Sequence, residues 1–508
     1  MRASTPRSPG GRIALALAFW AGFYVLAFAV AGGLLYFAYY IGDRGITEQR
    51  VQNAGGSFLL TLILIGAAIV AAGMILYSCL PRFRRWHPPG PLLDPKRHPA
   101  LFQEIQHVAR DCRQKMADDV YLTLEVNAWV LDRRRYWIFP RRVLAIGLPL
   151  LQSLTVSQFR SVLAHEFGHF VGGDTRLSPW VYRTHAAIER TVAALEGQDS
   201  IWRFPFLIYA RFFTRISLEI SRRQEYLADE LSARIAGVRA STEALKRIHR
   251  AGAAFGTFIH DELSPVLDAG KRPPIVEGFT RFMASPQSSK ALAQRMSTEL
   301  VAKPDHKDDT HPPLALRIEA LRGLAPGPDP RSDPAALDLL QDVDQMELEI
   351  LQVAMGNQKA GGLPRITWEE VPDQALLPTW REAVGTCWKE FKGITPASFP
   401  DLDLTSLGRR IDNDTTDSEA RGVAMRALGF GLLVALKDRG WTLGAAPGER
   451  LSAARGEVKV DPCHIFLDLA EGLMSRAEWK AKCEAGQFGD LDLGFALTPP
   501  PESPPVKL

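Results

Sequence analysis

Two long stretches without a charged residue, both near the N-terminus, restrict the fold of this chain more than any other feature. Residues 13–42 and residues 57–80 contain no Asp, Glu, Lys or Arg. A hydrocarbon core about 30 Å thick is crossed by about 20 helical residues, so each stretch is long enough to span it. The first stretch is also longer than the apolar segment of a signal peptide, about 7–15 residues. The sequence therefore predicts two transmembrane helices within a membrane anchor at residues 1–85.

The basic residues that flank these stretches predict the orientation of the anchor. They precede the first stretch and follow the second: Arg2, Arg7, Arg12, Arg82, Arg84 and Arg85. The connecting residues 43–56 carry two arginines that are balanced by two acidic residues. By the positive-inside rule both ends of the anchor face the cytoplasm. We therefore expect an integral protein of the inner or plasma membrane, in contact with the lipid bilayer, with most of the chain in the cytoplasm.

The overall composition argues against several classes of protein. The 508 residues include 60 Lys and Arg against 57 Asp and Glu, and no basic block indicates a nucleic-acid partner. The five cysteines are scattered and include no CxxC pair, so neither a disulfide framework nor a thiolate metal site is expected. Reduced cysteines agree with a cytoplasmic location.

Two proline-rich segments, residues 86–99 and 325–334, divide the remainder of the chain. We expect a first soluble domain at 101–325, a separate α+β C-terminal domain at 335–497, and a disordered tail at 498–508. The fold class expected is mainly α with a small β-sheet. The main predicted elements are helices at 101–116, 221–237, 337–355 and 419–438, and a strand at 120–131 with a second strand after it.

Residues 201–220 are rich in aromatic side chains but are interrupted by Arg203, Arg211, Arg215 and Glu219. Such charges are costly within a bilayer, which argues against a third transmembrane helix. We favour an amphipathic segment that packs in the core or lies at the bilayer surface.

The stretch LAHEFGH contains His165, Glu166 and His169. Thr155 and Gln158 form a capping-box pattern that predicts the start of a helix just before it. On that helix Glu166 lies within an apolar stripe, where an unpaired carboxylate costs several kcal/mol unless a cation faces it. Histidines at i and i+4 point the same way and suit a tetrahedral zinc ion. We therefore favour one zinc ion per chain over two structural histidines.

A catalytic zinc ion needs a third protein ligand. The pattern HExxHxxG would continue to a ligand at position 175, but that residue is Thr175. Glu225 and Asp229 instead share one face of a predicted second helix, beside the small residues Ser221, Ala228, Ser232 and Ala236. Glu225 is then the candidate ligand, and Asp229 would accept a hydrogen bond from a ligand histidine. The alternative is a solvated acidic face on a surface helix.

Four separated motifs together resemble the membrane zinc metalloproteases that include HtpX and the type I CaaX prenyl protease. They are NAWV at 127–130, LAHEFGH at 163–169, SRRQEYLAD at 221–229 and THPPLALRIEAL at 310–321. The resemblance covers roughly residues 85–325 and implies a zincin-like domain. Gln224 stands where many members have a basic residue. Members of that family usually have further membrane spans between the two helices, where this chain has its charged aromatic segment.

The resemblance implies a role for each matching residue. Zinc would be held by His165, His169 and Glu225, with Glu166 as general base and Asp229 orienting a ligand histidine. Asn127 and His311 would bind the substrate backbone or stabilise the oxyanion, and Arg317 would pair near Glu225. The candidate metal ligands also follow from the residues themselves, whereas Asn127, His311 and Arg317 depend on the resemblance alone.

These observations predict a membrane-anchored zinc endopeptidase that hydrolyses peptide bonds of protein substrates through a zinc-activated water. Our leading biological hypothesis is quality control of membrane proteins, with an extended substrate held beside the strand that follows Asn127. The alternatives are a non-catalytic scaffold stabilised by zinc, and a signalling protein that acts through residues 335–497. Glu166 favours the enzyme, because a structural zinc site does not require this residue.

Overall fold

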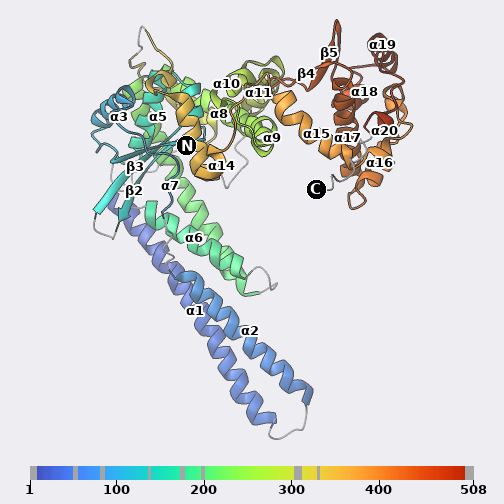
Figure 1. Cartoon of the computed structure of the whole chain (residues 1–508). Helices are drawn as coiled ribbons and strands as arrows, with labels where there is room; N and C mark the ends of the chain where they lie inside the picture. Colours follow the sequence, from blue (N-terminus) through green and yellow to red (C-terminus); the bar gives the residue numbers. More distant parts are fainter. Residues whose placement is uncertain are drawn as a thin grey trace, which may run out of the picture.

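The computed structural model describes residues 9–49, 55–80, 86–135, 139–171, 178–195, 201–301, 312–328 and 332–497. The predicted disordered tail at 498–508 lies outside these residues. Helix α1 (Pro9–Gln49) and helix α2 (Gly55–Cys79) form an antiparallel hairpin that projects from the rest of the molecule (Figure 1). Both predicted transmembrane helices are therefore confirmed as helices.

The surface of the α1–α2 hairpin is that of a membrane anchor. Ala18–Arg44 and Leu59–Cys79 are long and apolar enough to cross a membrane, and only 22% of each most apolar window is buried. A core helix of a soluble protein would be mostly buried, and α2 does not lie at the N-terminus as a signal peptide would. Large apolar side chains such as Val25 and Phe28 face outwards. Small side chains such as Ala31 and Ala72 fill the contact between the two helices.

A second helical hairpin stands beside the first. It consists of α6 (Ser178–Ala194) and of α7 (Phe204–Ala236), which is preceded by the 3-10 turn η3 (Ile201–Arg203). Phe206 and Phe213 of α7 are buried against α1. Residues 201–220 are thus the first half of one long helix, and they pack against the anchor. The two helices of the anchor are the only described ones that are long and apolar enough to span a membrane.

The first soluble domain contains a three-stranded sheet. Its strands are β1 (Asp119–Thr123), β2 (Ala128–Arg135) and β3 (Phe139–Gly147), in the order β1–β3–β2. β3 is parallel to β1 and antiparallel to β2. The single strand expected at 120–131 was wrong, because the chain bends at 124–127 and continues on the other side of β3. This places β2 at an edge of the sheet.

The rest of this domain is largely helical, and α4 and α5 pack against the sheet. Its helices are α3 (Pro99–Asp111), α4 (Leu148–Ser153), α5 (Val156–Gly168), α8 (Val238–Thr257), the π-helix η4 (Phe258–Leu263), α9 (Ser264–Asp268), α10 (Ile275–Ala284), α11 (Pro286–Val301) and α12 (Leu314–Arg322). Helix α3 ends before the expected residue 116, because Arg113 adopts the left-handed conformation, with a φ of 54°. Gly237, with a φ of 95°, ends α7 as expected.

The next segment packs on the same body. It contains η5 (Ala336–Leu339), α13 (Val343–Met355), α14 (Asn357–Gly361) and η6 (Pro372–Leu376). Its buried residues, from Ala336 to Ala375, belong to the hydrophobic clusters built around α5 and α10. The cluster of the C-terminal region begins only at Leu377. The hydrophobic cores thus divide near residue 376, whereas the sequence predicted a boundary near 335.

The C-terminal region is a separate α+β unit, as predicted (Figure 1). Its elements are α15 (Leu377–Gly385), η7 (Trp388–Phe391), η8 (Pro396–Asp401), α16 (Leu404–Ile411), α17 (Asp417–Lys437), β4 (Thr442–Gly444), β5 (Ser452–Arg455), β6 (Val458–Val460), α18 (Ile465–Ala470), α19 (Arg476–Gly486) and α20 (Leu493–Ala496). The predicted helix at 419–438 corresponds to α17, which is almost fully buried in its second half.

Candidate active site

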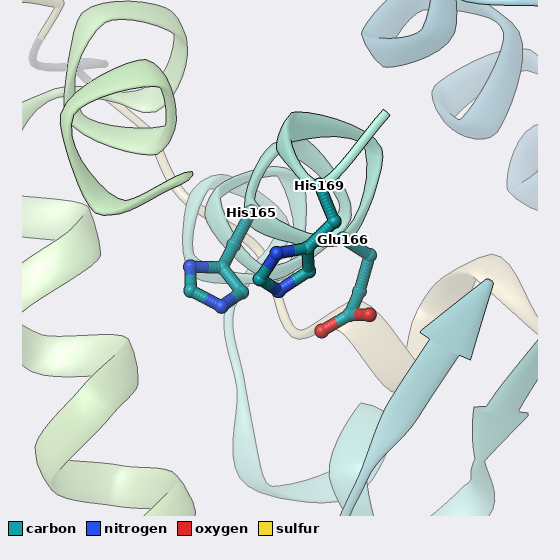
Figure 2. A group of neighbouring side chains, drawn as sticks. All are labelled: His165, Glu166 and His169. Atoms are coloured by element: carbon teal, nitrogen blue, oxygen red, sulfur yellow. The ribbon is translucent and has the colours of Figure 1, made fainter. Parts of the chain in front are cut away.

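The last turns of α5 present three polar side chains from one side of the helix. Figure 2 shows His165, Glu166 and His169 directed towards a common region beside the sheet. Candidate ligand atoms of the three side chains all lie within 4.8 Å of one another. The two imidazole rings are 4.8 Å apart between centroids. The spacing seen in the sequence therefore produces one compact group of potential metal donors.

Helix α7 brings a carboxylate to the same group. Glu225 is buried, with 4% of its surface exposed. Its Oε2 lies 3.5 Å from Nε2 of His165, and its Oε1 lies 3.8 Å from Nε2 of His169. The acidic pair on α7 is therefore not a solvated surface face, which was the alternative interpretation of the sequence.

Asp229 lies one turn further along α7 and contacts the other nitrogen of the first histidine. Its Oδ1 lies 3.0 Å from Nδ1 of His165. Burial raises the pKa of Asp229, but hydrogen bonds from Arg317 and His165 outweigh burial and lower this pKa. The ionised carboxylate of Asp229 accepts a hydrogen bond from the protonated Nδ1 of His165. The unprotonated Nε2 of the same ring is then directed at Glu225.

The same carboxylates affect the protonation of His165. Burial lowers the pKa of this imidazole, but the hydrogen bonds to Asp229 and Glu225 raise it to about 9. An excess of buried negative charge thus surrounds the histidine. Such a group is suited to a cation, whether a proton or a metal ion.

The donor set fits a zinc ion. Donors about 2.1 Å from a tetrahedral zinc ion lie about 3.4 Å from one another. The separations of 3.5 and 3.8 Å between Glu225 and the two histidine Nε2 atoms are close to this value. Two imidazoles with one carboxylate are also the donor types of many catalytic zinc sites.

Small side chains allow α5 and α7 to approach closely enough to form the group. A Cβ atom on Gly168 would lie 3.1 Å from Cα of Ala228, so a larger residue would require the two helices to move apart by a few tenths of an ångström. Further along, the hydroxyl groups of Ser161, Ser232 and Ser241 lie 2.8–3.0 Å from one another in the interior. These hydrogen bonds join α5, α7 and α8. They fix the position of Glu225 relative to the histidines.

The first turn of α5 is held by a residue that the sequence analysis did not identify. Asp333 accepts hydrogen bonds from the backbone N–H of Ser157 at 2.8 Å and from the hydroxyl of Thr155 at 2.6 Å. The predicted capping box is formed in part, because the N–H of Thr155 donates to Gln158 at 3.1 Å. Asp333 lies in the proline-rich segment that was expected to divide two domains, and no local pattern in the sequence reveals its contact with α5.

The residues expected from the resemblance alone have different positions. Arg317 of α12 is buried; its Nη1 lies 3.5 Å from Glu225, and its guanidinium also binds Asp229. Asn127 is exposed in the bend before β2, and its side-chain oxygen accepts a hydrogen bond from the N–H of Ala128 at 2.9 Å. His311 lies outside the described residues.

A helix that carries His-Glu-x-x-His, faced by a buried glutamate from a second helix, is the arrangement of a zinc metallopeptidase. Residues 95–325 match the family model described as Peptidase family M48. Residues 95–325 therefore form a domain of peptidase family M48, whose members are hydrolases acting on peptide bonds.

Similar proteins carry the name Protease HtpX. The protein from Ectopseudomonas mendocina (strain ymp) is 26% identical over 242 residues, which cover 44% of this chain and 72% of that protein. The protein from Pseudomonas fluorescens (strain SBW25) is 25% identical over 240 residues, covering 44% of this chain and 70% of that protein. The similarity is distant, and no solved structure matches the chain. Residues 335–497 lie beyond the part that matches the family model.

Proposed function

We propose that this chain cleaves membrane-associated or partly unfolded proteins at a single zinc site formed by His165, His169 and Glu225. The observation that carries the proposal is the meeting of the three side chains, with Glu225 at 3.5 and 3.8 Å from the two Nε2 atoms. Glu225 comes from α7 and is buried; Arg317, 3.5 Å away, already balances part of the buried acidic charge, and a zinc ion would add to this.

Glu166 is the proposed general base. A zinc ion in this site would supply Lewis acidity, polarising a substrate carbonyl and lowering the pKa of a bound water. Glu166 lies beside the ligands on α5 and is less deeply buried than Glu225. In this position its carboxylate takes the proton of the attacking water and delivers it to the leaving amine.

Asp229 and Arg317 are proposed to position the first ligand. Asp229 holds Nδ1 of His165, and Arg317 in turn holds both oxygens of Asp229. A hydrogen bond to the distal nitrogen fixes the tautomer and the ring orientation of a metal-binding histidine. Arg317 acts through Asp229 in this arrangement.

The substrate is proposed to bind along β2. This strand forms an edge of the sheet, and an extended peptide can add to such an edge through backbone hydrogen bonds. Asn127 immediately precedes β2, in a position to contact the added chain. His311 remains a prediction for the oxyanion, based on the resemblance of its motif.

We place the peptidase domain on the cytoplasmic side of the membrane. The arginines that flank the two spans support this orientation through the positive-inside rule, although Arg2, Arg7, Arg82, Arg84 and Arg85 lie outside the described residues. A cytoplasmic site next to the bilayer suits quality control of membrane proteins, the role that we favour.

The test is cleavage of an unfolded model protein by the full chain in nanodiscs, compared with Glu166→Gln. This variant keeps the three ligands, so its zinc content should equal that of the wild type while its rate falls by at least about 100-fold. Glu319→Gln, at an exposed residue that pairs with Arg322, serves as the matched control and should cleave at the wild-type rate.

Two outcomes would reject the proposal. Equal cleavage by the wild type and Glu166→Gln would show that the activity arises elsewhere. Stoichiometric zinc without cleavage in either protein would favour the non-catalytic scaffold. Metal analysis of the purified chain also distinguishes zinc from other divalent ions that accept the same donors.

A further inference from the structure

The first half of α7 exposes an apolar face that the proposed peptidase reaction does not use. Phe204, Ile208 and Phe212 are 60%, 52% and 62% exposed. Their spacing of four residues places them on one side of the helix. Exposed apolar side chains aligned in this way indicate an interaction surface.

The opposite face of the same half-helix packs against the membrane anchor. Phe206 contacts Phe23 of α1, and Phe213 contacts Phe19, with ring centroids 6.3 and 5.9 Å apart. The hydroxyl of Tyr209 donates to the backbone oxygen of Phe19. The exposed apolar face of α7 therefore points away from α1, at the level where the apolar span of α1 begins.

Helix α6 is attached at the end of the second span. The hydroxyl groups of Ser78 and Thr191 are 2.6 Å apart, and the Nε of Arg190 donates to the backbone oxygen of Ser78 at 3.3 Å. Ser78 is the penultimate residue of α2. Both helices of the hairpin thus contact the ends of α1 and α2 that lie nearest the soluble domain (Figure 1).

The α6–α7 hairpin begins and ends on the same side of the membrane. It begins after His169 and ends at Glu225, and these two residues lie together in the candidate site. α6 has 17 residues, about 26 Å of helix, and it contains Glu189 and Arg190. It is too short and too charged to cross a core about 30 Å thick.

We propose that the α6–α7 hairpin is a lipid-contacting element, with its Phe204–Ile208–Phe212 face among the outer acyl chains of the bilayer. The lipid surface that surrounds α1 and α2 continues onto α7 at this level. Arg211 and Arg215 are exposed at the level of Phe212 and one turn closer to Glu225, which places the end of this face at the height of the headgroup phosphates. The bilayer, rather than a second protein, is the partner that covers this face.

The test measures the accessibility of single reporter cysteines in the full chain, with one chain in each nanodisc. Phe204→Cys, Ile208→Cys and Phe212→Cys are exposed to a charged maleimide, after subtraction of the labelling of wild-type cysteines. Leu227→Cys, 50% exposed on the same helix, is the water-accessible control, and Val25→Cys, 68% exposed on α1, is the lipid-covered control.

We expect the three reporters to react at least 10-fold more slowly than Leu227→Cys, at rates similar to that of Val25→Cys. Rates within 2-fold of Leu227→Cys would overturn the proposal. A fluorophore at position 208 should also be quenched by lipids brominated in the acyl chain. Protection from maleimide without this quenching would mean that protein covers the face, which would equally overturn it. The readout does not depend on peptide hydrolysis.

Discussion

The carboxylate of Asp229 and the guanidinium of Arg317 form a buried two-point ion pair, with Nε to Oδ2 at 2.8 Å and Nη2 to Oδ1 at 2.6 Å. The same Oδ1 lies 3.0 Å from Nδ1 of His165. Three helices, α5, α7 and α12, are therefore connected through one carboxylate. The orientation of the first candidate ligand depends on a residue 88 positions beyond Asp229 in the sequence.

Replacing Asp229 with asparagine should weaken metal binding without removing a proposed ligand. Loss of the charged acceptor for the Nδ1 proton typically costs 10–100-fold in metal affinity. In a competition with a chelator, we expect Asp229→Asn to lose half of its zinc at a chelator concentration about 10–100-fold lower than the wild type requires. Glu230→Gln, at the neighbouring exposed residue, should behave as the wild type does. An unchanged affinity in Asp229→Asn would contradict the positioning role.

The ion pair itself can be tested by a double-mutant cycle. Arg317→Met leaves the buried carboxylate of Asp229 without its main partner and should destabilise the fold by about 3–5 kcal/mol. In the Asp229→Asn background the same change should cost less, because the uncompensated charge is absent. Denaturant unfolding of the four proteins measures this difference. Strictly additive effects would show that Arg317 acts independently of Asp229.

Removal of Glu225 should abolish both metal binding and cleavage. Glu225→Ala leaves two histidines, which are too few protein ligands for a stable catalytic zinc site. Zinc content, measured after dialysis, should fall from about one per chain to below about 0.1. Glu277→Gln, at an exposed residue of α10 bonded to Arg281, is the matched control. Full zinc occupancy in Glu225→Ala would assign the third ligand to another residue.

Asp333 should stabilise α5 from outside the part that matches the family model. Asp333→Ala removes the acceptor for the N–H of Ser157 and should cost about 1–2 kcal/mol in the free energy of unfolding. Asp338→Ala changes an exposed carboxylate in the adjacent turn and should have little effect. Thermal unfolding of both variants in nanodiscs makes the comparison. Equal stabilities would mean that the cap does not contribute.

Glu262 should make stability dependent on pH. Burial raises the pKa of this carboxyl to about 7, although the N–H of Gly448 donates a hydrogen bond to it. The usual value of 4.5 applies in the unfolded chain, so below this pH both states hold the proton. As the pH rises from about 4.5 to 7 the unfolded state ionises first, and the folded state loses stability.

Glu262→Gln is the variant that tests this linkage, because glutamine accepts the same hydrogen bond without a charge. It should match the wild type at pH 4.5 and exceed it by about 1–3 kcal/mol at pH 8. Unfolding at both pH values gives the difference. A stabilisation that is the same at pH 4.5 and at pH 8 would exclude ionisation of Glu262 as its cause.

The candidate site could be largely predicted because its signals are local. His165 and His169 are spaced for one face of a helix, and Glu225 and Asp229 repeat this spacing beside small residues on another. A helical spacing of four residues shows which side chains share a face without any knowledge of distant parts of the sequence. The membrane anchor was predictable for a similar reason, since a long uncharged run has few alternatives.

The contacts of Asp333 could not be predicted, because they join residues 176 positions apart. The proline-rich residues 325–334 predict a break between two domains. Absence of regular structure does not prevent packing, and the N–H of Ala336 donates to the backbone oxygen of Leu154. The domain boundary expected at 335 therefore differs from the division between the hydrophobic cores.

Helix α7 is uninterrupted from Phe204 to Ala236. This continuity fixes the distance between the proposed lipid-contacting face and the candidate metal site. Thirteen residues separate Phe212, at the proposed lipid surface, from Glu225, which corresponds to about 20 Å of helix. An extended polypeptide covers this distance with about six residues. A membrane-anchored substrate would therefore be cut no closer than about six residues from the bilayer. The length of the segment left attached to the membrane would then be set by the geometry of the enzyme rather than by the sequence of the substrate.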